Sequence, residues 1–124
     1  VGMSPGTRED LDALDRAGEI QVAGRRDDDS PRTLVTIWSV VVDGALHARS
    51  AFGTKARWYR GVMRHREGFV RWGGRTRPAR FTPDAARDDE IDRAYPARYG
   101  DGGRTRQVIG DAATATTLRV EPRP

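Results

Sequence analysis

The chain has 124 residues, of which 36% are hydrophobic and 32% charged, with a net charge of +4 and a sequence pI of about 10.3. This length allows one domain with a modest core, and the composition is that of a globular protein. No run of eighteen apolar residues and no cysteine is present, which excludes a membrane helix, disulfides and thiolate chemistry. Residues 1–10 show no charged-then-apolar leader, so we expect a cytoplasmic protein.

The basic character raises the question of nucleic-acid binding. Lys55 is the single lysine among 22 basic residues, and acidic residues are spread along the whole chain. The sequence lacks the combined aromatic and basic motif of RNA-binding sheets. We therefore expect no specific nucleic-acid partner and no membrane association.

The N-terminal region predicts a helix followed by a strand. Over residues 7–18, Thr7 is a suitable N-cap, leucines recur at helical spacing, and Gly18 marks the end. Residues 19–23 then alternate as a first strand. A polar connection over 24–33 follows.

The centre of the chain predicts a β-hairpin. An apolar strand over 34–42 is followed by Asp43-Gly44 and by a return strand over 46–51. Asp-Gly between two strands is typical of a type I′ turn, in which both central residues have positive φ. The first strand is apolar on both faces, so we expect a barrel interior on one side and a second layer or a partner on the other.

A helix is predicted over 55–65, with Thr54 as its cap. One of its faces is apolar and the other is basic. The apolar face comprises Trp58, Tyr59, Val62 and Met63, and the basic face comprises Arg57, Arg60 and Arg64.

A second hairpin is predicted over 69–81, with its turn at Gly73-Gly74. Pro78 lacks a backbone donor, so its strand is expected to be an edge strand or to carry a bulge. A helix is then expected from 84 towards Tyr99, with Pro96 kinking or ending it near Tyr95.

The last part of the chain predicts a flexible loop over 101–106 and a final strand over 114–120. Together the patterns predict a mainly β protein with short helices, a six-stranded antiparallel barrel. We expect a single domain, 1–124, comprising the N-terminal helix 7–18, core hairpins over 19–81 and a C-terminal helix and closing strand over 84–124.

Several motifs in the chain resemble those of a bacterial domain family of unknown function. They include Gly24-Arg25-Arg26, Arg32-Thr33, Ile37-Trp38-Ser39-Val40, Val42-Asp43-Gly44, Arg49-Ser50-Ala51, Trp58-Tyr59-Arg60 and Gly73-Gly74. That family is similar in turn to the split-barrel flavin and deazaflavin proteins, including the deazaflavin-dependent nitroreductases and the pyridoxamine phosphate oxidase group.

The resemblance implies a six-stranded split barrel, often dimeric, with a groove for FMN or a deazaflavin beside the central hairpin. It also implies that basic residues of the 24–33 segment hold the cofactor's phosphate and that aromatic residues contact its ring. We predict as cofactor-binding residues Arg32, Ser50, Trp58, Tyr59 and Arg60, which the resemblance implies, and Lys55, which could join the basic residues at the open end of the hairpin; Arg25 and Arg26 stand at the other basic positions of the loop.

One departure from the family pattern concerns the phosphate loop. Asp27-Asp28-Asp29 replaces a Ser-Gly segment, and each approach of a carboxylate to a phosphate costs roughly 4 kcal/mol at about 4 Å and an effective dielectric near 20. The alternative is that the arginines pair with these carboxylates on the surface and that Trp38 and Trp58 are core residues. Two functions therefore remain open: a small flavin- or deazaflavin-dependent oxidoreductase, and a non-enzymatic binding module of the same fold.

The sequence indicates no metal site and no catalytic acid or base. His47 and His65 lack the spacing of a transition-metal site, and no cysteine supports them. No phosphate-binding loop of the Walker type and no dinucleotide fingerprint is present.

Overall fold

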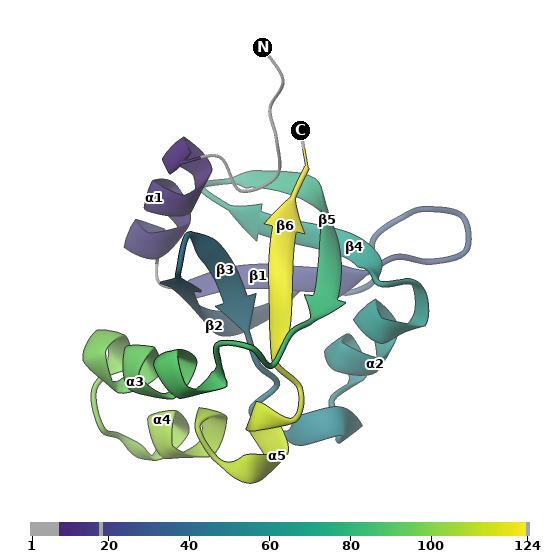
Figure 1. Cartoon of the computed structure of the whole chain (residues 1–124). Helices are drawn as coiled ribbons and strands as arrows, with labels where there is room; N and C mark the ends of the chain where they lie inside the picture. Colours follow the sequence, from purple (N-terminus) through teal and green to yellow (C-terminus); the bar gives the residue numbers. More distant parts are fainter. Residues whose placement is uncertain (1–7, 18, 124) are drawn as a thin grey trace.

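The computed structural model describes residues 8–17 and 19–123, and within them six antiparallel strands close into a barrel (Figure 1). The strand order around the barrel is β1-β2-β3-β6-β5-β4. The strands are β1 (Glu19–Gly24), β2 (Val35–Val42), β3 (Ala45–Ala48), β4 (Glu67–Trp72), β5 (Arg75–Pro83) and β6 (Leu118–Pro122). The predicted six-stranded antiparallel barrel is confirmed.

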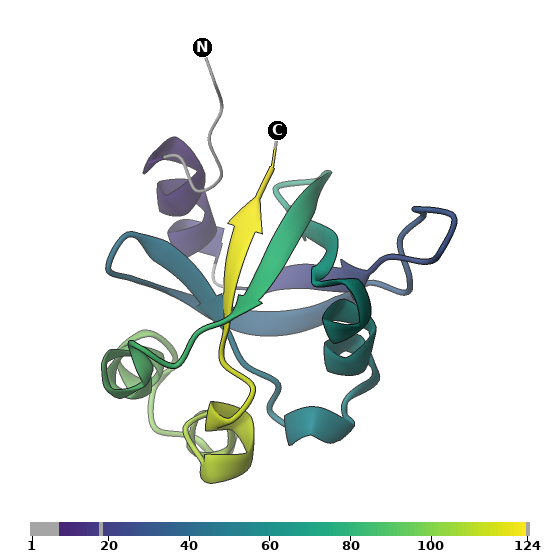
Figure 2. The same ribbon diagram turned by 45° about the vertical axis from the view of Figure 1, so that its right-hand side comes forward.

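Short helices surround the barrel. They are α1 (Arg8–Ala17), the 3-10 turn η1 (Gly53–Lys55), α2 (Arg57–His65), α3 (Asp88–Tyr99), α4 (Gly103–Val108) and α5 (Asp111–Thr114). In Figures 1 and 2, α3, α4, α5 and η1 gather on one side of the barrel, whereas α1 lies on the other. The predicted cap Thr7 and stop Gly18 of the first helix lie outside the described residues. No described helix has the length and apolar character needed to cross a membrane.

The central hairpin has the predicted turn. Asp43 and Gly44 have φ of 52° and 72°, the positive values that a type I′ turn requires. The return strand is shorter than predicted and ends at Ala48. Residues 49 and 50 leave the ladder because other groups bind them: the Ser50 amide donates to Thr116 Oγ1 at 2.8 Å.

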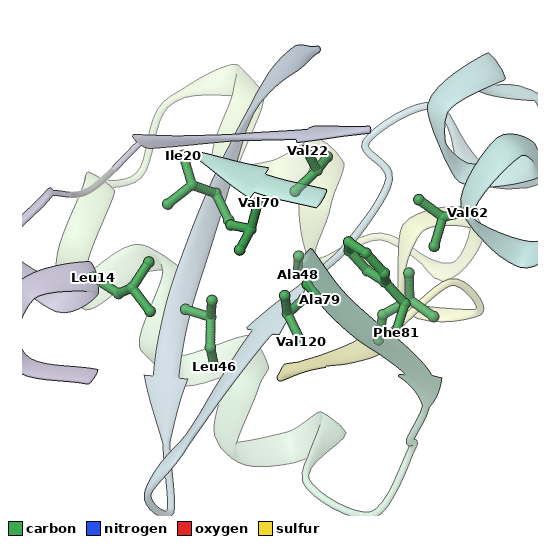
Figure 3. Packing of buried hydrophobic residues seen from close by; sticks show 11 residues of the cluster. Leu14, Ile20, Val22, Leu46, Ala48, Val62, Val70, Ala79, Phe81 and Val120 are labelled. Atoms are coloured by element: carbon green, nitrogen blue, oxygen red, sulfur yellow. The ribbon is translucent and has the colours of Figure 1, made fainter. Parts of the chain in front are cut away.

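Strand β2 is covered on both faces, as its apolar pattern predicts. Ile37 and Val41 pack against the barrel interior, a cluster that includes Leu14 of α1 and Val62 of α2, which enter it from opposite sides in Figure 3. The other face of β2 packs on α3 and α4. Its cluster comprises Val40, Val42, Ile91, Tyr95 and Val108, with Trp38 and Tyr99 at its margin.

Helix α2 begins later than predicted. The chain first forms η1, and Ala56 is extended before the helix starts at Arg57, with no side-chain cap. Thr54 is therefore part of the 3-10 turn and does not cap the helix. The two faces are as predicted, since Val62 is buried while Arg57, Arg60 and Arg64 are exposed.

The expectation for Pro78 was wrong. Strand β5 lies between β4 and β6, and both ladders are continuous, so β5 is neither an edge strand nor bulged. Pro78 opposes Phe69 of β4 and precedes the first β5–β6 pair, Ala79 with Pro122. Its missing amide therefore interrupts no pairing with β6, and its carbonyl accepts from the Arg123 amide at 2.7 Å.

The C-terminal region differs most from the expectation. Helix α3 continues through Pro96 to Tyr99 and ends at Gly100, whose φ is 82°. Because Pro96 lies in the last turn, it removes only one helical hydrogen bond. The predicted loop 101–106 contains most of α4, and the last strand begins at Leu118 because residues 114–117 end α5 and form a turn.

Candidate functional site

A groove of about 260 Å³ lies between the first half of β2, the segment after β3, and α4. Its lining is mainly apolar and aromatic. The lining residues are Glu19, Val35, Thr36, Ile37, Trp38, Arg49, Ala51, Phe52, Trp58, Arg104, Gln107 and Val108. The helices that contribute lining residues are α4 and the first turn of α2.

Trp38 forms the best-supported wall of the groove. Its ring stacks on Tyr99 of α3, with centroids 4.1 Å apart and an interplanar angle of 3°. The Tyr99 hydroxyl donates to the Ser39 carbonyl at 2.6 Å, which ties the stack to β2, and burial raises the pKa of this hydroxyl. The Arg104 guanidinium lies 5.0 Å from the centre of the Trp38 ring. The indole is thus held in one orientation before any ligand binds.

Two further aromatic residues lie at the groove. Trp58, in the first turn of α2, lines it and meets Tyr59 edge-on at 6.0 Å. Tyr59 packs against the barrel core instead of the groove. Phe52 is 74% exposed, which is unusual for a phenylalanine and leaves an apolar side chain at the groove's rim.

Arg49 is the buried cation of the site. Its side chain has no exposed surface, and its five N–H groups have five acceptors. Nε donates to Thr117 Oγ1 at 2.9 Å. Nη1 donates to Asp92 Oδ1 at 2.5 Å and to the Val108 carbonyl at 3.1 Å. Nη2 donates to the carbonyl and carboxylate of Asp88 at 3.3 and 3.1 Å. Arg49 therefore has no donor left for a ligand, and it joins the end of β3 to α3, α4 and the turn before β6.

The six predicted cofactor-binding residues are not brought together at this groove. Trp58 lines it; the other five do not. Ser50 is fully buried, and Lys55 and Arg60 are exposed on η1 and α2. Arg32 lies against Gly61 of α2, and its Nε donates to the Arg25 carbonyl at 3.4 Å. Their role in cofactor binding stays a prediction.

The acidic residues of the 24–33 loop form ion pairs and hydrogen bonds with nearby residues of the protein. Arg25 Nη1 binds Asp29 Oδ1 at 2.5 Å, and Asp28 accepts from both the hydroxyl and the amide of Ser30, which lowers the pKa of Asp28. Asp27 lies 3.9 Å from Arg64. The carboxylates of the loop therefore occupy positions beside the arginines that a phosphate would need.

The base of this loop is also closely packed. A Cβ on Gly24 would lie 2.5 Å from the carbonyl carbon of Gly61, so the end of β1 and helix α2 touch at the backbone. Only a glycine permits this approach. The loop and α2 are therefore adjacent, with little free space between them at this point.

Most of the groove residues were not predicted as site residues, and Phe52, Arg104 and Gln107 come from segments to which sequence reasoning gave no role. Phe52 lies between the predicted return strand and the predicted helix 55–65, Arg104 lies in the predicted loop 101–106, and Gln107 directly follows that loop. Helix α4 has only six residues, too few for apolar residues at helical spacing to reveal a helix in the sequence. Only the packing of α4 beside β2 brings these side chains to the groove.

No cluster of three or more histidine, aspartate or glutamate side chains suited to a metal ion occurs in the described part of the chain. His47 is buried on β3, and His65 Nε2 lies 3.4 Å from Asp27. Neither histidine lines the groove.

Residues 10–120 match a bacterial family described as an uncharacterized protein conserved in bacteria, DUF2255. This chain belongs to the DUF2255 family. The match covers most of the chain and confirms the resemblance to a bacterial family of unknown function. No curated protein matches the sequence.

Several solved structures share the fold of this DUF2255 member. The haem storage protein HutZ of Vibrio cholerae is 10% identical with a TM-score of 0.61, over 94% of this chain and 88% of that chain. An FAD-binding protein of Mesorhizobium loti is 18% identical with a TM-score of 0.52, over 94% and 88%. An F420 reductase is 18% identical with a TM-score of 0.50, over 91% and 90%. These likenesses show the split-barrel fold.

Proposed function

We propose that the groove beside β2 binds the ring system of a flavin or deazaflavin cofactor. The observation that carries this proposal is the preformed apolar groove walled by Trp38 and Trp58. Small-molecule sites are typically concave and mostly apolar, with a few polar groups that fix orientation. Structural neighbours described as an FAD-binding protein and an F420 reductase support the same class of ligand.

The size of the groove supports a ring rather than a whole nucleotide. At about 260 Å³ it lies just below the usual range of small-molecule pockets, which begins at about 300 Å³. The ribityl and phosphate parts of FMN would extend past the rim. The residues that would orient the ring are Trp38, Ile37 and Trp58.

The groove supports a flavin better than a haem. One neighbour is described as a haem storage protein, but none of the lining residues is histidine, cysteine, methionine or tyrosine, the usual ligands of haem iron. Aromatic and aliphatic side chains suit an uncharged planar ring.

As an oxidoreductase, the protein would contribute binding, orientation and exclusion of water, while the cofactor when bound supplies hydride transfer to a small acceptor. No side chain at the groove is proposed as a proton donor or acceptor. Positioning of the ring by Trp38 and its Tyr99 support is the contribution that the geometry favours.

A homodimer is part of this proposal. Phe52 and Val35 are exposed large apolar residues, and both line the groove. A second copy seated over this rim would bury Phe52 and close the groove to water. Closure of this kind would keep a reduced cofactor away from solvent.

The second candidate is a binding module of the same fold that carries no redox cofactor. The observation that favours it is the loop 24–33, whose carboxylates pair with arginines of the same region, Arg25 with Asp29 and Arg64 with Asp27. A loop closed in this way offers fewer free donors to a phosphate.

The deciding experiment is a titration of the protein with FMN and with F420, followed by difference absorbance and thermal shift. We expect saturable binding of one of them, and an affinity about tenfold lower in Trp58→Ala, because an aromatic contact of the ring is lost. Trp72→Ala is the matched control, since Trp72 is also half-buried but lies beside Arg77, away from the groove. Folded wild-type protein that binds neither compound would refute the redox proposal and favour the binding module.

A further inference from the structure

The groove has two cations in its lining, Arg49 and Arg104. Every donor of Arg49 is already used within the protein. Arg104 is exposed and makes no hydrogen bond or ion pair to the described residues; its recorded contact is with the ring of Trp38. The cation that remains available to a ligand in this groove is therefore Arg104.

Arg104 and Tyr99 both contact the Trp38 ring, and the parallel stacking of Tyr99 on one face leaves the other face for the guanidinium. Tyr99 lies parallel to the indole at 4.1 Å and holds the Ser39 carbonyl, so its side is occupied by the fold. The other contact is the Arg104 guanidinium at 5.0 Å from the ring centre. A planar ligand that stacks on Trp38 has to take the place of this guanidinium.

Given the ring site proposed above, we propose that Arg104 binds the anionic group of the ligand, a phosphate or carboxylate, after it leaves the face of Trp38. An exposed cation–π contact is weak, and a guanidinium paired with a phosphate or carboxylate is held by charge-assisted, often bidentate hydrogen bonds. Exchange of the first for the second is favourable, and the freed indole face becomes available to the ring. One residue thus couples ring stacking to anion recognition.

This assignment places the anion at α4, away from the arginines of the 24–33 loop. Glu19 is the only carboxylate among the described lining residues and makes no recorded pair with Arg104. Arg60 and Arg32, which the resemblance implies for the phosphate, are not part of the lining. If the anion lies at α4, a variant of Arg104 should lose anion recognition. If it lies at the 24–33 loop and α2, a variant of Arg32 or Arg60 should lose it instead.

The test compares FMN with riboflavin, which has the same ring but no phosphate. Affinities are measured by flavin fluorescence titration for wild type, Arg104→Gln, Arg106→Gln and Arg60→Gln. We expect wild type to bind FMN about tenfold more tightly than riboflavin. Arg104→Gln should lose this preference and bind riboflavin at least as tightly as wild type, because nothing then competes for the Trp38 face.

Arg106→Gln is the matched control, because Arg106 lies on the same short helix, is exposed, donates to the Asp101 carbonyl and does not line the groove. Its preference for FMN should equal that of wild type. Three outcomes would overturn the inference while leaving ring binding intact. The preference for FMN could persist in Arg104→Gln, it could be absent in wild type, or it could be lost only in Arg60→Gln. Wild type that binds neither flavin also overturns the inference, and only if it fails to bind F420 as well is the proposed function itself refuted.

Discussion

At the scale of single residues, the protein buries two polar side chains two positions apart, His47 in β3 and Arg49 just after it, and they differ in how their hydrogen-bonding groups are satisfied. Arg49 has an acceptor for each of its N–H groups. His47 is 2% exposed, and its Nδ1 atom has no hydrogen-bond partner among the described residues. A buried, incompletely satisfied imidazole is a pH-sensitive point in the fold.

Burial lowers the pKa of His47 below its usual value of 6.5, against the opposing effect of Asp84, while Arg119 and Arg49 lower it further. The folded state therefore binds this proton less well than the unfolded state does. The contribution of neutral His47 is complete above pH 6.5 and is lost as the pH falls below it, at no more than about 1.4 kcal/mol per pH unit for one proton. We expect the urea concentration at the unfolding midpoint of wild type to decrease as the pH is lowered from 7 to 5.

His47→Gln removes the titrating group at the same position. The difference in unfolding free energy between wild type and His47→Gln should shrink as the pH is lowered through this range. His65→Gln serves as the control, because His65 lies at the end of α2 and is partly exposed. A difference between wild type and His47→Gln that is independent of pH would contradict the prediction.

At the scale of elements, the helical layer α3–α4 is attached to the barrel by an apolar cluster, by one arginine and by hydrogen bonds from Tyr95 and Tyr99 to β2. Val40 and Val42 of β2 pack on Ile91 and Tyr95 of α3, and Arg49 binds Asp88, Asp92 and the Val108 carbonyl. Asp88 also accepts from Thr117 Oγ1 at 2.7 Å. Because the groove lies between β2 and α4, this attachment positions its walls.

Arg49→Met should destabilise the protein by roughly 3 kcal/mol, because it leaves Asp88 and Asp92 without their cation and three further acceptors without a donor. The measurement is denaturant unfolding followed by circular dichroism. Arg80→Met, an exposed arginine of β5, is the control and should change stability by no more than about 0.5 kcal/mol. Equal losses in the two variants would show that the Arg49 network contributes nothing specific.

At the scale of the whole molecule, the described helices leave one apolar rim uncovered. The barrel interior is filled, α1 and α2 close it from two sides, and α3 and α4 cover one face of β2 (Figures 1 and 3). Phe52, between β3 and η1, remains 74% exposed at the groove. The proposed homodimer is the arrangement that buries it.

Phe52→Ser should weaken the proposed dimer by about tenfold or more, because most of an aromatic side chain would no longer leave water on association. Analytical ultracentrifugation over a concentration series measures this change. Phe52→Leu, which keeps the apolar character, should remain closer to wild type. Wild-type protein that sediments as a monomer at all concentrations would rule out the dimer.

The sequence by itself determined the strands and turns. Alternation in residues 19–23 and 34–42, and the Asp43-Gly44 and Gly73-Gly74 turns, depend on neighbouring residues only, so their positions follow from local rules. The apolar residues on both faces of β2 also predicted a second layer over the barrel. The barrel could be predicted for the same reason, because short strands with tight turns and no crossover helices have few ways to bury their faces.

The tertiary structure decided the groove. Arg104, Phe52 and Trp38 come from separate segments and meet only because α4 packs beside β2. Whether an arginine is saturated, like Arg49, or available, like Arg104, depends on partners as many as 68 residues away in the chain, as with Thr117. The sequence shows 22 basic residues of nearly one kind, and only their three-dimensional surroundings distinguish a structural arginine from one that can bind a ligand.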